Sequence, residues 1–375
     1  MNISKENLTT EGFSGTPQNA GRSGHRVENT ALLILVALCL LFIGLSMTVF
    51  KGTDFRADLD YLMAIQNFRE FSHQAFNKFF LFITDFGAGK LCCLILIFIY
   101  FGFSTRLGNF IVQVYAYADF MNGLLKLTVC AFRPWVRDEL ILPPGDAKVA
   151  ATGYSFPSGH STGATSIFGG LILGSRQKSL ALIIGAGLML ILVLFSRNYL
   201  GVHTPQDVLI GLLSTLALIL VMRKIFRWLE TGNQLSKKWI LFVISLVLST
   251  LAAVYYEFKS YPQLTGADGS LIVDPAKLIL DSYKGIGYYI GGAASLLFVH
   301  YFRGYEAENA TAEQRIGTVL IALIVYYLVT MVLSPQFIHM LPARFAYTAE
   351  GFSRIFITFG ILPVVAGRML AKKSG

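Results

Sequence analysis

Charge is scarce in this sequence of 375 residues. Asp, Glu, Lys and Arg make up 14% of it, against 54% for hydrophobic residues. A soluble domain could not bury so much apolar surface. The composition therefore excludes a soluble protein and indicates a polytopic membrane protein. The net charge of +9 does not predict a nucleic-acid partner, because no basic face on a soluble domain accompanies it.

Cysteine is also rare. The four cysteines are Cys39, Cys92, Cys93 and Cys130; they lie in or at the edge of apolar runs and form no CxxC pair. This pattern predicts neither a disulfide framework nor a zinc site. The sequence also lacks HExxH and GxxxxGKS/T motifs, and its acidic residues do not have Mg²⁺-type spacing. We therefore expect neither a metal nor another cofactor.

Long apolar runs dominate what is present. Ten of them are candidate membrane spans, at about residues 31–50, 86–105, 107–130, 157–175, 179–195, 206–222, 239–256, 285–302, 316–334 and 352–370. Residues 1–30 are rich in Ser, Thr, Gly and Asn, which predicts a disordered cytoplasmic tail. Between residues 60 and 83, apolar side chains recur at helical spacing among polar ones, which predicts an amphipathic helix along the outer interface.

The orientation of these spans follows from the loops. With the N-terminus in the cytoplasm, the inner segments carry an excess of Lys and Arg over Asp and Glu, as the positive-inside rule requires. This threading places Lys126, Pro157, Ser196 and Thr204 at outer ends of their helices. Hydropathy alone therefore brings three polar motifs to one outer face.

Two prolines on this face indicate helix starts. Proline is favoured at the first helical position, where its missing N–H would be unpaired anyway, so Pro157 and Pro205 each predict a helix opening. At Pro157 the N–H groups of Ser158, Gly159 and His160 would then be free at the positive end of the helix dipole. Such a helix start is an anion site.

Three cations accompany this helix start. Lys126 precedes Arg133 by seven residues, and Arg197 follows on a later span. Taken singly, a long cation at a helix end more often extends to the interface. Taken together, they would neutralise an anion, and phosphate is the anion that such a group suits best.

These residues resemble the signatures of the type 2 phosphatidic acid phosphatase (PAP2) superfamily, which are KxxxxxxRP, PSGH and SRxxxxxHxxxD. All three occur in order and at their spacing: Lys126, Arg133 and Pro134; Pro157 to His160; Ser196, Arg197, His203 and Asp207. The resemblance covers about residues 60–223. It implies a PAP2-like core of six helices within an all-α, polytopic membrane helical bundle of about ten transmembrane helices.

The resemblance also implies roles. His203 would be the nucleophile that forms a phosphohistidine, with Asp207 stabilising its imidazolium, and His160 would protonate the leaving oxygen and later activate water. The phosphoryl oxygens would be held by Lys126, Arg133, Ser158, Gly159 and Arg197. A structural alternative stays open, in which Thr204 to Asp207 only cap a helix and His160 is an interfacial histidine.

The expected activity is metal-independent hydrolysis of a lipid phosphate or polyprenyl diphosphate at the extracytoplasmic face of the cytoplasmic membrane. The partners would be this lipid substrate and the bilayer. A phosphotransferase with the same phosphohistidine, or a lipid transporter or flippase, remains an alternative. We expect a tail (1–30), a catalytic membrane domain (31–229) and an additional four-helix region of unknown role (230–375). The sequence leaves the substrate and the oligomeric state open.

Overall fold

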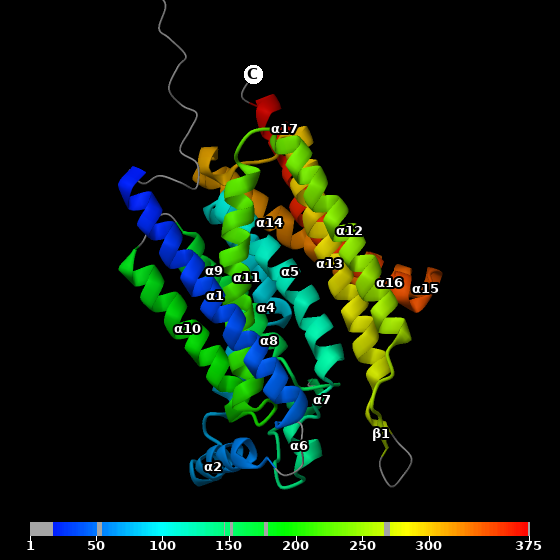
Figure 1. The fold of residues 1–375 in the computed structure, drawn as a ribbon. Helices are drawn as coiled ribbons and strands as arrows, with labels where there is room; N and C mark the ends of the chain where they lie inside the picture. Colours follow the sequence, from blue (N-terminus) through cyan, green and yellow to red (C-terminus); the bar gives the residue numbers. More distant parts are fainter. Residues whose placement is uncertain are drawn as a thin grey trace, which may run out of the picture.

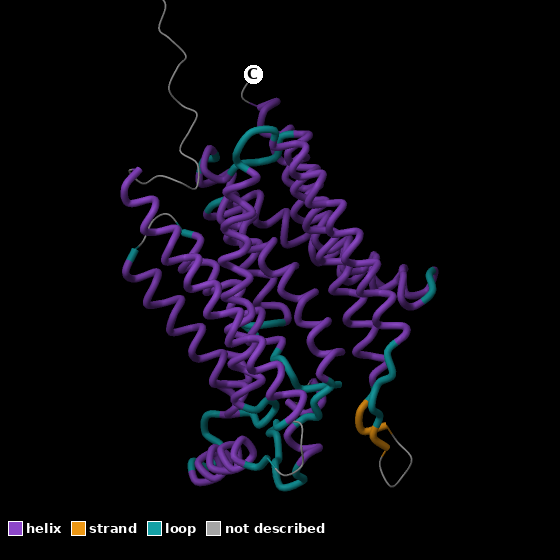
Figure 2. Tube along the Cα trace, in the orientation of Figure 1, coloured by secondary structure: helices purple, strands orange, loops and turns teal. Residues whose placement is uncertain are grey.

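The computed structural model describes residues 18–50, 55–145, 147–150, 153–175, 179–265 and 271–373. Over these ranges the chain is a bundle of long helices, joined by short loops (Figures 1 and 2). The strands in this part of the chain are β1 (Leu264–Thr265) and β2 (Leu271–Val273), which pair as a small antiparallel hairpin. The predicted all-α class is confirmed.

Helices occupy every one of the ten predicted spans. In chain order they are α1 (Gln18–Thr48); α4 with η1 (Gly89–Ile97, Phe98–Phe103); α5 (Thr105–Val129); α8 with η2 and α9 (Gly159–Ala164, Thr165–Gly169, Gly170–Gly174); α10 (Leu180–Tyr199); α11 (Pro205–Leu229); α12 (Gln234–Phe258); α13 (Pro275–Phe302); α14 with η4 and α15 (Ala312–Leu328, Val329–Leu333, Ser334–Met340); and α16 with η5 and α17 (Ala343–Phe356, Ile357–Ile361, Leu362–Lys373).

Six of these helices are long and apolar enough to cross a membrane on length and composition alone. They are Val27–Thr48, Leu180–Tyr199, Pro205–Leu229, Gln234–Phe258, Ala312–Met340 and Ala343–Ala371. α5 and α13 are equally long but more polar. The arrangement is that of a polytopic bundle.

Side-chain caps explain where several long helices begin. An oxygen of the residue before the helix accepts a hydrogen bond from a free backbone N–H of the first turn. The capping residues are Ser104 for α5, Thr204 for α11, Asn233 for α12, Asp274 for α13 and Thr311 for α14.

Two expectations near the N-terminus need correction. Helix α1 begins at Gln18, so residues 18–30 of the predicted disordered tail are helical, while residues 1–17 lie outside the described part. The predicted single amphipathic helix is two helices, α2 (Ala57–Phe71) and α3 (Asn77–Thr84). His73 and Gln74 have φ of 49° and 59°, which no α-helix accommodates, and the chain turns there.

The helix ends fall into two sets. Figure 1 shows the start of α1 and the end of α17 at one end of the bundle, with α2, α6 (Pro134–Arg137) and the hairpin at the other. The second end also holds the C-terminus of α10 and the N-termini of α8 and α11, and we call it the site end.

Glycines let the helices approach closely. A Cβ built on Gly287 of α13 would lie 2.1 Å from the carbonyl oxygen of Thr348, and one on Gly291 would lie 2.9 Å from that of Phe352. These two glycines therefore seat α16 directly against α13. On the other side, Gln113 of α5 donates to the carbonyl of Gly292 at 3.0 Å. Helix α13 thus joins the C-terminal helices to α5.

Candidate active site

The three sequence motifs converge at the site end of the bundle. Lys126 lies near the end of α5, Arg197 near the end of α10 and Asp207 in the first turn of α11. Electrostatic interactions join His160 to His203 and to all three cations. The residues that the motifs singled out therefore form one cluster, although they come from four separate parts of the chain.

The helix that carries His160 begins differently from expectation. Pro157 is not its first residue, because α8 starts at Gly159 and Ser158 caps it, with its Oγ 3.3 Å from the N–H of Ser161. The N–H of Ser158 donates to the carbonyl of Asp207 at 2.9 Å. The first-turn N–H groups that remain without an acceptor inside the helix are therefore those of Gly159 and His160.

At the start of α11, Asp207 caps the helix and also lies near His203. Thr204 and Asp207 form a capping box, in which the carboxylate accepts from the N–H of Thr204 at 2.8 Å, and Pro205 is the first helical residue, as predicted. The same Oδ2 atom accepts a hydrogen bond of 2.6 Å from the hydroxyl of Ser155. The cap thus fixes a carboxylate that also belongs to the site.

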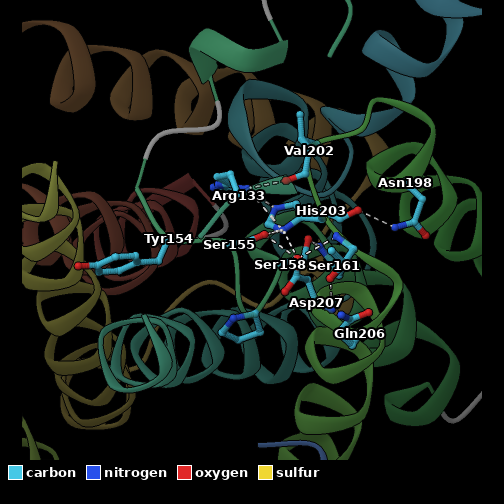
Figure 3. Close-up of polar contacts among 12 residues, drawn as sticks. Arg133, Tyr154, Ser155, Ser158, Ser161, Asn198, Val202, His203, Gln206 and Asp207 are labelled. Atoms are coloured by element: carbon cyan, nitrogen blue, oxygen red, sulfur yellow. Dashed lines mark hydrogen bonds and ion pairs between the residues drawn. The ribbon is translucent and has the colours of Figure 1, made fainter. Parts of the chain in front are cut away.

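The imidazole of His203 lies between a cation and this carboxylate (Figure 3). Its Nε2 is 2.9 Å from Nη1 of Arg133. Its Nδ1 is 3.3 Å from Oγ of Ser155 and 3.6 Å from Oδ2 of Asp207. The same Nη1 is 3.4 Å from Nδ1, so it is closer to Nε2. Because Arg133 can only donate, we infer that Nε2 carries the lone pair and that the proton is on Nδ1, facing the carboxylate.

The surroundings of His203 keep it uncharged. Burial holds the pKa of His203 well below its ordinary value of 6.5, and the charges of Arg133 and then of two further cations lower it more. The backbone fixes the ring as well, since Asn198 donates to the carbonyl of His203 at 2.9 Å. A neutral imidazole with a free lone pair is what a nucleophile requires.

Lys126 holds the loop that precedes α8. Its Nζ is 2.7 Å from the carbonyl oxygen of Pro157 and 3.4 Å from those of Tyr154 and Ser155. Asn122, one turn earlier on α5, donates to the hydroxyl of Thr162 at 3.0 Å. The polar residues of α5 therefore position the loop and α8, in addition to placing a cation at the site.

Arg197 is held by a residue that sequence reasoning did not identify. Its Nη1 donates to Oγ1 of Thr84 at 2.5 Å, and Asp85 acts on it electrostatically. The helix is interrupted between Thr84, the end of α3, and Gly89, the start of α4. A Cβ built on Gly87 in this break would be 2.4 Å from the carbonyl oxygen of His160. No motif marked this break; an Asp and two glycines inside an apolar run were the available signal.

The three cations are buried. Lys126, Arg133 and Arg197 are at most 8% exposed, and the carboxylates that act on them electrostatically are Asp207, Asp85 and, on Lys126, Asp119. Within the described residues, the Nε–H of Arg197 is buried with no acceptor. Three buried cations beside an unpaired donor are a site for an anion.

A second layer of ion pairs covers the site end. Asp58 of α2 accepts from Nη1 of Arg137 at 2.5 Å and from Gln206 of α11 at 2.6 Å. Arg69 of α2, 2% exposed, donates to the carbonyl of Tyr199 at 3.1 Å. The sequence predicted only that α2 is amphipathic. In the structure α2 lies over the site end and bonds both to the C-terminus of α10 and to the N-terminus of α11.

No group of three or more His, Cys, Asp or Glu side chains that could hold a metal ion occurs among the described residues. The positive charge at this site is instead carried by lysine and arginine.

Comparison with known proteins agrees with the motifs. Residues 99–230 match the model of the PAP2 superfamily. Phosphatidylglycerophosphatase B of Bacillus subtilis (strain 168) is 31% identical over 141 residues, which cover 34% of this chain and 64% of the relative. No solved structure matches. The superfamily resemblance is therefore confirmed for the part of the chain that carries the three motifs.

Proposed function

On the premise that residues 99–230 belong to the PAP2 superfamily, we propose that this protein hydrolyses the terminal phosphate of a lipid phosphate through a phosphohistidine. The observation that carries the proposal is the buried imidazole of His203, set between Arg133 on Nε2 and the Ser155 and Asp207 pair on Nδ1. The relative's name, phosphatidylglycerophosphatase, makes phosphatidylglycerol phosphate the first substrate to test.

In the first step Nε2 of His203 attacks phosphorus. A phosphoryl group at Nε2 displaces the guanidinium of Arg133, which then contacts the phosphoryl oxygens together with Lys126 and Arg197. The bond from phosphorus to the lipid oxygen breaks, and that oxygen takes a proton from His160 and leaves as the lipid alcohol. Asp207 stabilises the resulting positive charge on the imidazole.

In the second step water attacks the phosphohistidine. His160, now neutral, takes a proton from the water, the nitrogen–phosphorus bond breaks, and inorganic phosphate is released. Both proton transfers are assigned to His160 because it lies at the start of α8 and interacts electrostatically with His203. Lys126, Arg133 and Arg197 supply the positive charge, so the proposed reaction needs no metal.

The site end would face the outside of the cytoplasmic membrane. The support is the balance of charge, because Lys and Arg outnumber Asp and Glu more strongly at the opposite end of the bundle than at the site end. In this orientation a lipid phosphate in the outer leaflet meets the cations directly with its headgroup.

Release of inorganic phosphate tests the proposal. The detergent-purified full chain should release phosphate from phosphatidylglycerol phosphate or phosphatidic acid, and His203→Ala should release none. An added alcohol acceptor distinguishes hydrolysis from phosphotransfer, because a transferase would give a new phosphate ester. Equal release by the wild type and His203→Ala would refute the proposal and leave the transporter hypothesis.

A further inference from the structure

A cavity of about 500 Å³ lies outside the phosphate site, between α4, α5 and the C-terminal helices. Seven of its eleven lining residues come from α13, α14, η4 and α16, which lie beyond the match at residues 99–230. This volume is within the range of small-molecule sites. The C-terminal region thus contributes most of a binding-sized cavity.

The cavity opens toward the bilayer. Tyr327 and Met331 on its rim are 61% and 48% exposed, and Leu94 is 43% exposed. Tyr327 and Met331 lie on a helix that is long and apolar enough to cross the membrane, and Leu94 lies on the shorter apolar helix Leu91–Phe103. Hydrocarbon, and not water, therefore surrounds the opening.

Among the described residues of the cavity wall, Arg354 carries the positive charge, and Glu350 offsets it. Nη2 of Arg354 is 2.6 Å from Oε1 of Glu350, and Glu350 also lies 3.5 Å from Nζ of Lys284. The apolar walls, which include Leu323 and Met331, suit an uncharged chain.

The cavity is aligned with the phosphate site along α5. Tyr115 lines the cavity and lies eleven residues before Lys126, about three turns and about 16 Å along the helix, so both side chains are on similar faces. Half of a bilayer's hydrocarbon core is about 15 Å. A lipid whose phosphate is bound at Lys126 and whose hydrocarbon chain reaches the middle of the bilayer therefore has its chain end at about the depth of Tyr115.

The two sites also share a wall. A Cβ built on Gly163 of α8 would lie 3.5 Å from Cε2 of Tyr115, one turn from His160. Gly89, which lines the cavity, follows Gly87, which packs on the carbonyl of His160. The cavity wall at Tyr115 and Gly89 is therefore next to segments that carry His160 or pack against it.

We propose that this cavity receives the inner end of a hydrocarbon chain of the lipid whose phosphate binds at Lys126, Arg133 and Arg197. The proposal rests on the proposed lipid phosphatase activity. It assigns the C-terminal helices a function, selection of substrates with a chain long enough to reach the middle of the bilayer.

A larger side chain that fills the cavity should lower kcat/KM for long-chain lipids only. In Leu323→Trp, kcat/KM for dipalmitoyl phosphatidic acid should fall by about tenfold, the lower end of what one misfitted methylene costs in an apolar pocket. Activity on dihexanoyl phosphatidic acid, whose chains end before the cavity, should be unchanged. Ile324→Trp is the matched control, since Ile324 is on the same helix, does not line the cavity and is exposed. It should match the wild type on both lipids.

Equal kcat/KM values for the wild type and Leu323→Trp on the long-chain lipid would overturn the proposal, as would an equal loss on both lipids. A binding measurement keeps the test independent of catalysis. Dipalmitoyl phosphatidic acid with a diazirine at one chain end is photolysed with the reconstituted full chain in phosphatidylcholine vesicles. The label should map to Leu323 and Tyr327, and unlabelled phosphatidic acid should compete it away.

Label spread evenly over exposed residues such as Ile324, or not displaced by phosphatidic acid, would also overturn it. If the wild type cleaves neither of these lipids nor phosphatidylglycerol phosphate, the proposed phosphatase activity fails, and the photolabelling result alone decides whether the cavity takes a phosphatidic acid chain.

Discussion

The Nδ1 atom of His203 lies 3.6 Å from Oδ2 of Asp207, and the hydroxyl of Ser155 stands beside both, 2.6 Å from the carboxylate and 3.3 Å from the ring nitrogen. The distance between the first two is too long for a hydrogen bond. The carboxylate therefore acts on the imidazole partly through a hydroxyl that belongs to the loop before α8.

This geometry predicts different losses for Asp207→Asn and Ser155→Ala. Asp207→Asn removes the charge that stabilises the imidazolium, and the comparable change in a serine-protease triad costs about 10⁴-fold. Ser155→Ala removes the two hydrogen bonds of this hydroxyl, worth about 1 kcal/mol each, or roughly 30-fold together. Rapid-quench rates of phosphoenzyme formation measure both. Equal losses would show that Ser155 is as essential as the carboxylate.

Substitution of His203 and of His160 should block different steps of the reaction. His203→Ala has no nucleophile, so no phosphoenzyme should form with any substrate. His160→Ala should lose about 10²- to 10⁴-fold on a lipid phosphate, but much less in forming the phosphoenzyme from p-nitrophenyl phosphate, whose leaving group needs no acid. Its phosphoenzyme should then accumulate. Quench labelling with ³²P substrate separates these cases, and a phosphoenzyme that persists in His203→Ala or maps to His160 would reverse the assignment.

We expect Thr84 to affect catalysis through its hydrogen bond with Arg197. Thr84→Val keeps the shape but removes the acceptor of the Nη1 hydrogen bond, which leaves a buried charged donor unpaired at a cost of about 1 to 3 kcal/mol. We expect kcat/KM to fall by about tenfold or more. Thr250→Val is the matched control, because Thr250 is exposed and bonds only within its own helix. Wild-type kinetics in Thr84→Val would separate Thr84 from the site.

Metal removal should have little effect. Lys126, Arg133 and Arg197 supply the charge that a divalent cation would otherwise bring, so phosphate release should be nearly unchanged in EDTA. Abolished activity that returns on addition of Mg²⁺ would show that the three cations are not sufficient.

The orientation can be tested with two single cysteines. Leu140→Cys lies in the loop after α6 at the site end, where Leu140 is 66% exposed, and Glu313→Cys lies in the exposed first turn of α14 at the other end. In intact cells an impermeant thiol reagent should label position 140 and not 313. The reverse pattern would place the site end in the cytoplasm.

The sequence by itself determined the helices and most of the site. The ten apolar runs and the capping residues are local signals, because a span is set by its own length of apolar residues and a cap by atoms within one turn. The spacing of the three motifs likewise predicted a cluster of two histidines, one carboxylate and three cations. Local signals also misled at Pro157, where the helix begins two residues later because Ser158 caps it.

Only the tertiary structure showed which side chains from distant segments are in contact. Thr84 meets Arg197 across 113 residues, and Ser155 meets Asp207 across 52. The cavity is lined by residues of α4, α5, α13, α14 and α16, which are far apart in the sequence. These contacts depend on how helices pack, and packing is set by the fit of whole surfaces, which no local pattern of residues specifies.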